Sequence, residues 1–103
     1  MDKLFSALSL SRKAGALAVG FDAVKESLTG KKAALILNAS DVSQATLQRI
    51  ENSNIAKVKL FQLPYTQQQL VPLVGKPVGI LAVNNNDLAA LCVQALLNKE
   101  EPV

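Results

Sequence analysis

The chain has 103 residues, half of them apolar, which is enough for one packed domain but not for a second. Its uninterrupted apolar runs, such as residues 33–37, are far shorter than the roughly 20 residues of a membrane-spanning helix, and the N-terminus lacks the basic head and long apolar stretch of a secretory signal. The formal net charge of +3 comes entirely from residues 1–32, which hold six basic and three acidic residues, so a polyanionic partner is permitted but not required.

A helix, a strand and a second helix are predicted first along the chain. Apolar residues recur at three- and four-residue spacing over residues 2–14, which predicts a helix that ends at Gly15. Residues 16–19 form a short apolar run typical of a strand, and Gly20 ends it. Helical spacing then returns over residues 21–29.

The middle of the chain predicts two strands around a third helix. Residues 33–37 are apolar without alternation, as expected for a strand covered on both faces. Ser40 and Asp41 offer side-chain oxygens that suit the start of a helix continuing through Ile50. Residues 58–63 then predict a third strand.

The last part of the chain predicts a short helix, a strand and a final helix. Pro72 follows the helical residues 67–70 and is expected to kink this helix or limit it to one turn, because proline lacks an N–H donor. Residues 78–83 predict a fourth strand. Asp87 is interpreted as the cap of an apolar helix over residues 88–97.

Alternation of helices and strands predicts an α/β protein, a three-layer α/β/α sandwich with a four-stranded mixed central sheet. We expect one domain over residues 1–98 and a frayed tail over residues 99–103. The single cysteine, Cys92, lies in an apolar helical setting, which predicts a buried and inert thiol. A chain without an internal disulfide is expected in the cytoplasm.

The sequence lacks the patterns that would nominate an enzyme. It has no histidine, no zinc-ligand spacing, no phosphate-binding loop and no dinucleotide or serine-nucleophile motif. We therefore predict a non-enzymatic protein that uses neither a cofactor nor a metal ion.

Two segments carry chemistry of a different kind, and residues 20–26 are the first. They open a helix directly after a strand, where unpaired backbone N–H groups and the positive end of the helix dipole favour phosphate. Lys25 lies near that turn, and Lys31 and Lys32 leave the same helix. The alternative reading is an ordinary turn glycine followed by solvated helix residues.

The second segment is the loop Gly75-Lys76-Pro77-Val78-Gly79. It combines two glycines, one positive charge and an apolar side chain, Val78, that is expected to be exposed. Glycine beside proline is also ordinary turn chemistry. Spacing alone does not say whether this loop lies near residues 20–26.

Three stretches stand out together for their order and spacing: Leu10–Lys25, Leu35–Asp41 and Leu70–Val83. They resemble bacterial members of the kink-turn-binding ribosomal-protein superfamily, which includes the archaeal protein L-seven-Ae and the eukaryotic protein L-thirty-e. The resemblance covers nearly the whole chain and implies an α/β/α sandwich that grips a sharply bent RNA internal loop.

The resemblance also implies which residues contact RNA. The start of the second helix is expected in the RNA major groove at tandem sheared G·A pairs, and the loop before the last strand is expected to cover a flipped-out base. Carried onto this sequence, these two sets are Gly20, Phe21, Asp22, Ala23 and Lys25, and Gly75, Lys76, Pro77, Val78 and Gly79. Lys31 and Lys32 join them as expected phosphate contacts.

The sequence departs from the family pattern at the helix start. Strong kink-turn binders of this family carry Asn-Glu after the glycine and a lysine three residues beyond the glutamate, where this chain has Asp22, Ala23 and Glu26. Alanine accepts no hydrogen bond from a guanine edge, and a glutamate repels phosphate. Lys25 is turned about 100° from position 26 around the helix axis.

Two hypotheses follow. The first is a non-catalytic RNA-binding protein, associated with the ribosome, that recognises kinked or structured RNA and neither DNA nor a membrane. The second is a protein-interaction module on the same fold that has lost kink-turn recognition. The final helix is apolar almost all round, so the more specific version of the second hypothesis is a homodimer formed through that helix.

Overall fold

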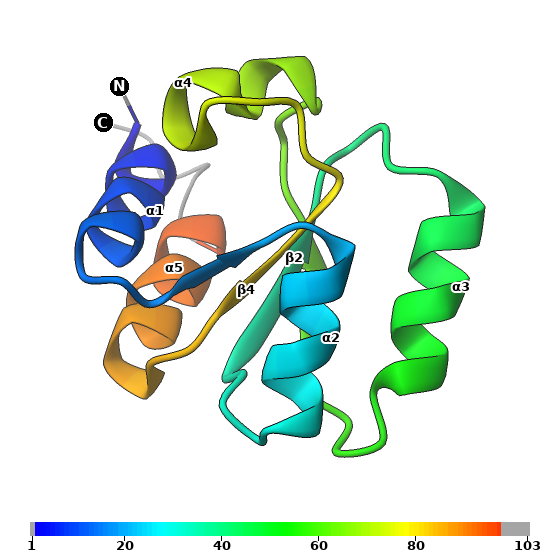
Figure 1. The fold of residues 1–103 in the computed structure, drawn as a ribbon. Coiled ribbons are helices and arrows are strands. Elements are labelled where there is room, and N and C mark those ends of the chain that lie inside the picture. The colour runs from blue at the N-terminus through cyan, green and yellow to red at the C-terminus, as the bar shows by residue number, and fades with distance from the viewer. Residues whose placement is uncertain (1, 98–103) are drawn as a thin grey trace.

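The computed structural model describes residues 2–97 of the chain (Figure 1). These residues form five α-helices, a 3-10 helix and four strands, and the predicted tail over residues 99–103 lies outside them. In chain order the elements are α1 (Lys3–Lys13), β1 (Leu17–Val19), α2 (Phe21–Thr29), β2 (Leu35–Asn38), α3 (Gln44–Ser53), β3 (Leu60–Gln62), η1 (Gln68–Leu70), α4 (Val71–Val74), β4 (Ile80–Val83) and α5 (Asn86–Leu97).

The four strands form one mixed sheet in the order β1-β4-β2-β3. Strand β2 pairs in parallel with β3 and antiparallel with β4, which in turn pairs antiparallel with β1. The N-terminal ends of β2 and β3 therefore lie at the same end of the sheet as the C-terminal end of β4. The prediction of a four-stranded mixed sheet is confirmed.

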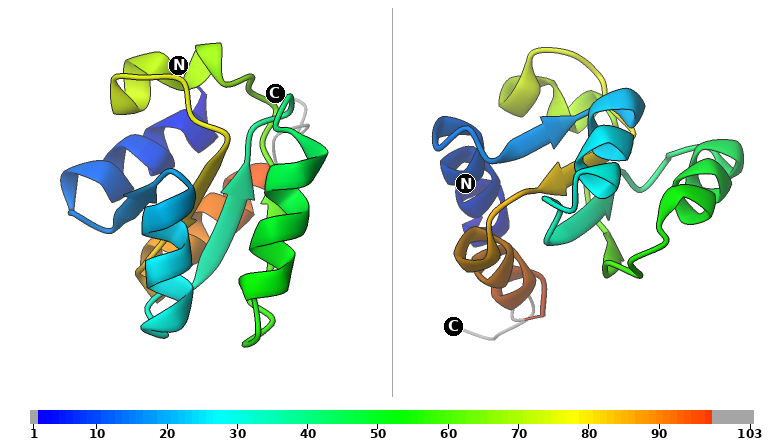
Figure 2. Two further views of the ribbon diagram at one scale, coloured as in Figure 1. Left: turned by 45° about the vertical axis from the view of Figure 1, so that its right-hand side comes forward. Right: turned by 60° about the horizontal axis from the view of Figure 1, so that its bottom comes forward.

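Alternating side chains divide the core between the two faces of this sheet. In β2, Leu35 and Leu37 pack with α1, α4 and α5, whereas Ile36 packs with α2 and α3. In β4, Leu81 faces the first set of helices and Ile80 the second. Figure 2 shows helices on both sides of the strands, which confirms the predicted α/β/α sandwich.

The start of α3 differs from its prediction. Ser43, rather than Ser40 or Asp41, caps the helix, because its Oγ accepts a hydrogen bond from the Thr46 backbone N at 3.1 Å. The backbone N of Ser40 is already used by the carbonyl oxygen of Tyr65 at 2.8 Å, and Asp41 Oδ1 accepts from the backbone N of Gln67 at 2.9 Å. These bonds tie residues 40 and 41 to the segment that follows β3, and α3 begins only at Gln44.

Two further expectations concern the last part of the chain. Pro72 does interrupt the helix, which is split into the 3-10 turn η1 and the one-turn helix α4. The cap assigned to Asp87 is wrong, because Asn85 Oδ1 accepts from the backbone N of Leu88 at 2.9 Å and Asp87 lies inside the first turn. An asparagine one residue before the helix was the better acceptor position.

Helix α5 packs against α1 on one face of the sheet. Cys92 is fully buried there, and burial raises the pKa of its thiol, as expected for an inert cysteine. No helix within residues 2–97 has the length and apolar character needed to cross a membrane.

Candidate nucleic-acid interface

Gly20 sets the start of α2 through a backbone conformation that only glycine adopts readily. Its φ of 92° and ψ of 165° lie where a Cβ is strongly disfavoured. The first helical hydrogen bond runs from the Val24 backbone N to the Gly20 carbonyl oxygen, and no side chain caps the helix. The N–H groups of the first turn therefore point out of the helix end.

The start of α2 lies beside the loop before β4. The Gly20 backbone N donates to the carbonyl oxygen of Ile80 at 3.0 Å, and the carbonyl oxygen of Gly79 accepts from the Ala39 backbone N at 3.0 Å. The structure thus brings together the two segments that the sequence singled out, a proximity that spacing alone did not predict. In Figure 1 this loop runs from α4 to the top of α2.

Within the loop, one expectation is wrong. Val78 is only 5 % exposed, because its side chain packs into the core shared by α1, α4 and α5. It is therefore not available to cover a base. Lys76 and Pro77 are exposed, and Gly75 has a left-handed φ of 87° that ends α4.

A pocket of about 240 Å³ lies between the start of α2, the start of α3 and the loop. Its lining combines apolar side chains with hydroxyl and amide groups. The lining residues are Phe21, Val42, Ser43, Thr46, Gln67, Gly79 and Ile80. A Cβ added to Gly79 would approach Val42 Cγ2 to 2.8 Å, so the glycine keeps the pocket at its present shape.

Phe21 forms the edge of this pocket and contacts a cation from α3. The guanidinium Cζ of Arg49 lies 4.0 Å from the centroid of the Phe21 ring, which is a cation–π contact. Sequence reasoning found Phe21 but missed Arg49, as well as Val42, Ser43, Thr46 and Gln67. No local pattern carries the contact between residues 21 and 49, because only the packing of α2 against α3 creates it.

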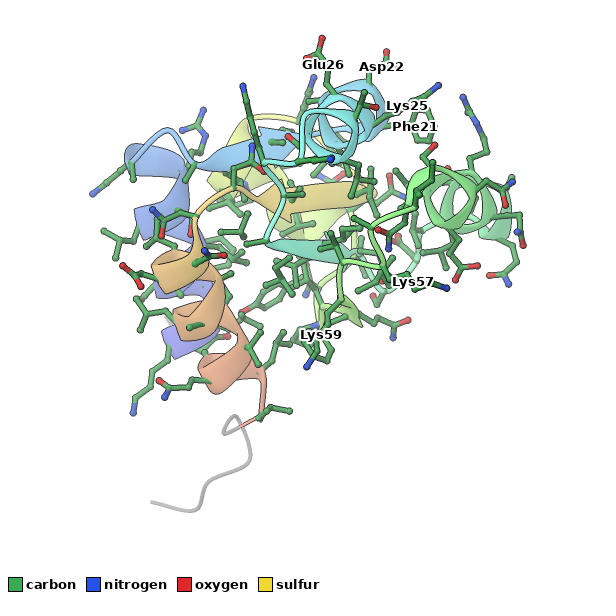
Figure 3. All side chains as sticks on the ribbon, turned by 90° about the horizontal axis from the view of Figure 1, so that it is seen from below. Phe21, Asp22, Lys25, Glu26, Lys57 and Lys59 are labelled. Atoms are coloured by element: carbon green, nitrogen blue, oxygen red, sulfur yellow. The ribbon has the colours of Figure 1, made fainter. Side chains whose placement is uncertain are left out.

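The charged residues of α2 are exposed on its outer surface. Asp22 and Glu26, one turn apart, point away from the sheet, and Lys25 lies beside Phe21 in the same view (Figure 3). Ala23 is partly buried. The positive charge beside the pocket is therefore supplied by Arg49 and Lys25, next to two carboxylates.

Lys31 and Lys32 lie at the opposite end of α2 and are not brought together with its start. The nine residues of α2 separate the two places by about 13 Å. Lys31 has a left-handed φ of 58°, and its backbone N donates to the Leu28 carbonyl oxygen at 3.1 Å. The Lys32 backbone N donates to the Ser27 carbonyl oxygen at 2.9 Å, which completes a Schellman motif with lysine in the usual glycine position.

The predicted dimer helix, α5, is only partly buried. Between α1 and α5 lies a groove of about 420 Å³, bordered by the half-exposed side chains of Leu10 and Leu91. Gln94 and Lys3 also line it. The face of α5 that carries Cys92 is clamped against α1 and the sheet, so the groove uses the remaining face alone.

No protein-family model matches this chain, and no curated protein matches it. Solved structures do resemble it. A protein of unknown function from Bacillus halodurans C matches with a TM-score of 0.82 and 14 % identity, over 93 % of this chain and 98 % of that chain. A Giardia lamblia 15.5kD RNA binding protein matches with a TM-score of 0.69 and 13 % identity, over 95 % of this chain and 85 % of that chain. This chain therefore shares its fold with an RNA-binding protein.

Proposed function

We propose that this protein binds a kinked or otherwise structured RNA, with ribosomal RNA the first candidate, through the start of α2 and the loop before β4. The observation that carries the proposal is the pocket between them, which combines an uncapped helix start with apolar and polar lining side chains. The fold shared with an RNA-binding protein supports the same reading.

The pocket suits an unpaired base. RNA-binding proteins recognise single-stranded or splayed-out bases by apolar and aromatic contacts, with hydrogen bonds to the base edge. Here Ile80 and Val42 supply apolar atoms, and Ser43, Thr46 and Gln67 supply donors and acceptors. The exposed N–H groups at the start of α2 suit a neighbouring phosphate, because they coincide with the positive end of the helix dipole.

The proposal is tested with a kink-turn hairpin and a control hairpin whose G·A pairs are replaced by Watson–Crick pairs. We expect tighter binding to the kinked RNA and a steep loss of affinity with salt, since phosphate contacts release counterions. Fluorescence anisotropy at two salt concentrations measures both quantities. Equal affinity for the two hairpins would contradict recognition of the kink, and no binding to either would contradict the RNA function.

Arg49 is expected to contribute to this affinity. The guanidinium is held over Phe21, which lines the pocket. Arg49→Gln should weaken binding to the kink-turn hairpin about tenfold, because a phosphate or base contact of about 1.4 kcal/mol is lost. The matched control is Arg12→Gln, which removes the other arginine of the chain from an exposed position of α1. An equal loss in both variants would mean that only net charge matters.

A protein-interaction role is the second candidate, and the groove between α1 and α5 favours it. Leu10 and Leu91 are 49 % and 44 % exposed on its borders, so an apolar partner would remove both from water. Light scattering over a concentration series separates the dimeric form of this candidate from the RNA proposal. A strictly monomeric protein would remove that form.

A further inference from the structure

A second group of positive charges lies at the end of the molecule opposite to the pocket. Lys31 and Lys32 follow α2, and Lys57 and Lys59 lie between α3 and β3; these four are called the far-end lysines below. The backbone N of Ile36 in β2 donates to the Lys59 carbonyl oxygen at 2.9 Å. Because β2 and β3 are parallel neighbours, both lysine-bearing loops enter the sheet at the same end of these strands. Figure 3, seen from this end, labels Lys57 and Lys59 there.

The loop of Lys57 is held rigidly by the side chain of Asn54. The Asn54 Nδ2 donates to the Val58 carbonyl oxygen at 2.8 Å, and Asn54 Oδ1 accepts from the Val58 backbone N at 2.9 Å. The Lys57 backbone N also donates to the Asn54 carbonyl oxygen at 3.2 Å. The loop of Lys31 is held by its Schellman bonds in a comparable way. Both pairs of lysines therefore extend from fixed backbone.

Two of the far-end lysines have a backbone conformation that is unfavourable for a residue with a Cβ. Lys31 has a φ of 58° and Lys57 a φ of 59°, and no other non-glycine residue in the described part of the chain has a positive φ. Glycine or asparagine suits this region better. Strain that coincides with the same charged residue in two separate loops points to a role for the side chains rather than for the backbone.

We infer that the far-end lysines hold the phosphate backbone of a second RNA segment, so that the protein bridges two parts of a folded RNA. Neither loop, residues 29–34 or 54–60, contains an acidic residue, which leaves the lysines to attract a polyanion. The length of α2, about 13 Å, exceeds the Debye length of about 8 Å at physiological salt. The charges at the two ends are therefore largely screened from each other, and each surface is expected to contact its own RNA segment. This inference rests on the proposed function of the pocket.

Ile55 offers the far-end surface a further contact. It is 88 % exposed, in the turn between Asn54 and Val58 that the Asn54 side chain braces. The minor groove of an RNA duplex is wide and shallow, and it admits such a side chain while lysines reach the flanking phosphates. A single apolar side chain offers too little area to anchor the protein in a bilayer. We therefore favour RNA over an anionic membrane.

The test uses the double variant Lys31→Gly with Lys57→Gly and a plain RNA duplex of about 16 base pairs that lacks a kink-turn. These substitutions remove two charges and place glycine where the backbone is left-handed, so the fold is preserved. The control, Arg12→Gln with Lys13→Gln, removes two charges from exposed positions of α1. We expect the glycine variant to lose at least tenfold in duplex affinity, and the control to lose less than threefold. The melting temperature of the glycine variant should be no lower than that of the wild-type protein.

The same measurements separate this inference from the proposed function. Binding of the wild-type protein to the kink-turn hairpin, with duplex affinity unchanged in the glycine variant, would overturn the second surface alone. Failure of the wild-type protein to distinguish the kinked hairpin, with duplex binding still dependent on the far-end lysines, would overturn the pocket alone. Equal losses in the glycine and control variants would overturn the second surface. So would binding of phosphatidylserine vesicles that the glycine variant abolishes while its duplex affinity stays unchanged.

Discussion

Gly20→Ala is expected to lower the free energy of unfolding by about 1–3 kcal/mol, which is the usual cost of a side chain in this backbone region. A Cβ at Gly20 would meet no atom within 4 Å, so the cost comes from the backbone conformation and not from a clash. The backbone relieves this strain by rotating away from its φ of 92°, which moves the first turn of α2 and the bond to Ile80. RNA affinity should fall about tenfold, as expected when one phosphate contact is lost.

Gly15→Ala is the matched control for this prediction. Gly15 has a φ of 72° at the end of α1, and a Cβ there would also meet no atom within 4 Å. The two substitutions therefore impose backbone strain without a clash, one at the proposed interface and one away from it. Chemical denaturation should show a loss in both variants, whereas anisotropy should show weaker RNA binding in Gly20→Ala only. A loss of RNA binding in both would mean that stability, and not the start of α2, controls affinity.

Local signals in the sequence were sufficient for the elements and for the two segments of the candidate interface. Gly15 and Gly20 mark the end of α1 and the start of α2, and both have the positive φ that explains the choice of glycine. Apolar runs without alternation marked β2 and β4, whose side chains are buried on both faces of the sheet. These signals are readable because each depends on neighbours only a few residues away.

The errors arose where contacts between distant residues decide the outcome. Asp41 looked like a helix cap, but it bonds to Gln67 in the loop before η1. Val78 looked exposed because a glycine- and proline-rich loop is usually exposed, yet the core beneath α4 takes up its side chain. Arg49 gave no signal at all, because its contact with Phe21 depends on how α2 packs on α3.

The placement of Lys31 and Lys32 changes the interpretation of the positive charge in residues 1–32. On the sequence they belonged with Lys25 as phosphate contacts of one helix. The length of α2 separates them from the pocket, and the parallel pairing of β2 with β3 places their loop at the same end of the sheet as the loop of Lys59. Charge that is contiguous in the sequence is thus divided between two ends of the fold, and the proposed RNA contact at the pocket leaves Lys31 and Lys32 unused.

The start of α2 differs from the residue pattern of strong kink-turn binders, and we expect substitutions toward that pattern to raise the affinity for kinked RNA. The triple variant Asp22→Asn, Ala23→Glu and Glu26→Lys introduces the residues that the resemblance to kink-turn-binding proteins implies for strong binding at these positions. It should bind the kink-turn hairpin at least about 30-fold more tightly, since it adds two contacts worth about 1–3 kcal/mol each. Asp22 and Glu26 are exposed and Ala23 is only partly buried, so circular dichroism should show an unchanged fold.

Specificity decides what such a gain would mean. The triple variant adds two positive charges, and Asp87→Lys in the first turn of α5 adds the same two charges away from the pocket. Added charge alone strengthens binding to kinked and Watson–Crick hairpins alike, because both carry the same phosphates. If the triple variant gains only as much as Asp87→Lys, on both hairpins, the start of α2 does not read G·A pairs. A gain confined to the kinked hairpin would mean that the backbone of α2 already has the geometry for this recognition and that Asp22, Ala23 and Glu26 hold the affinity of the natural protein low.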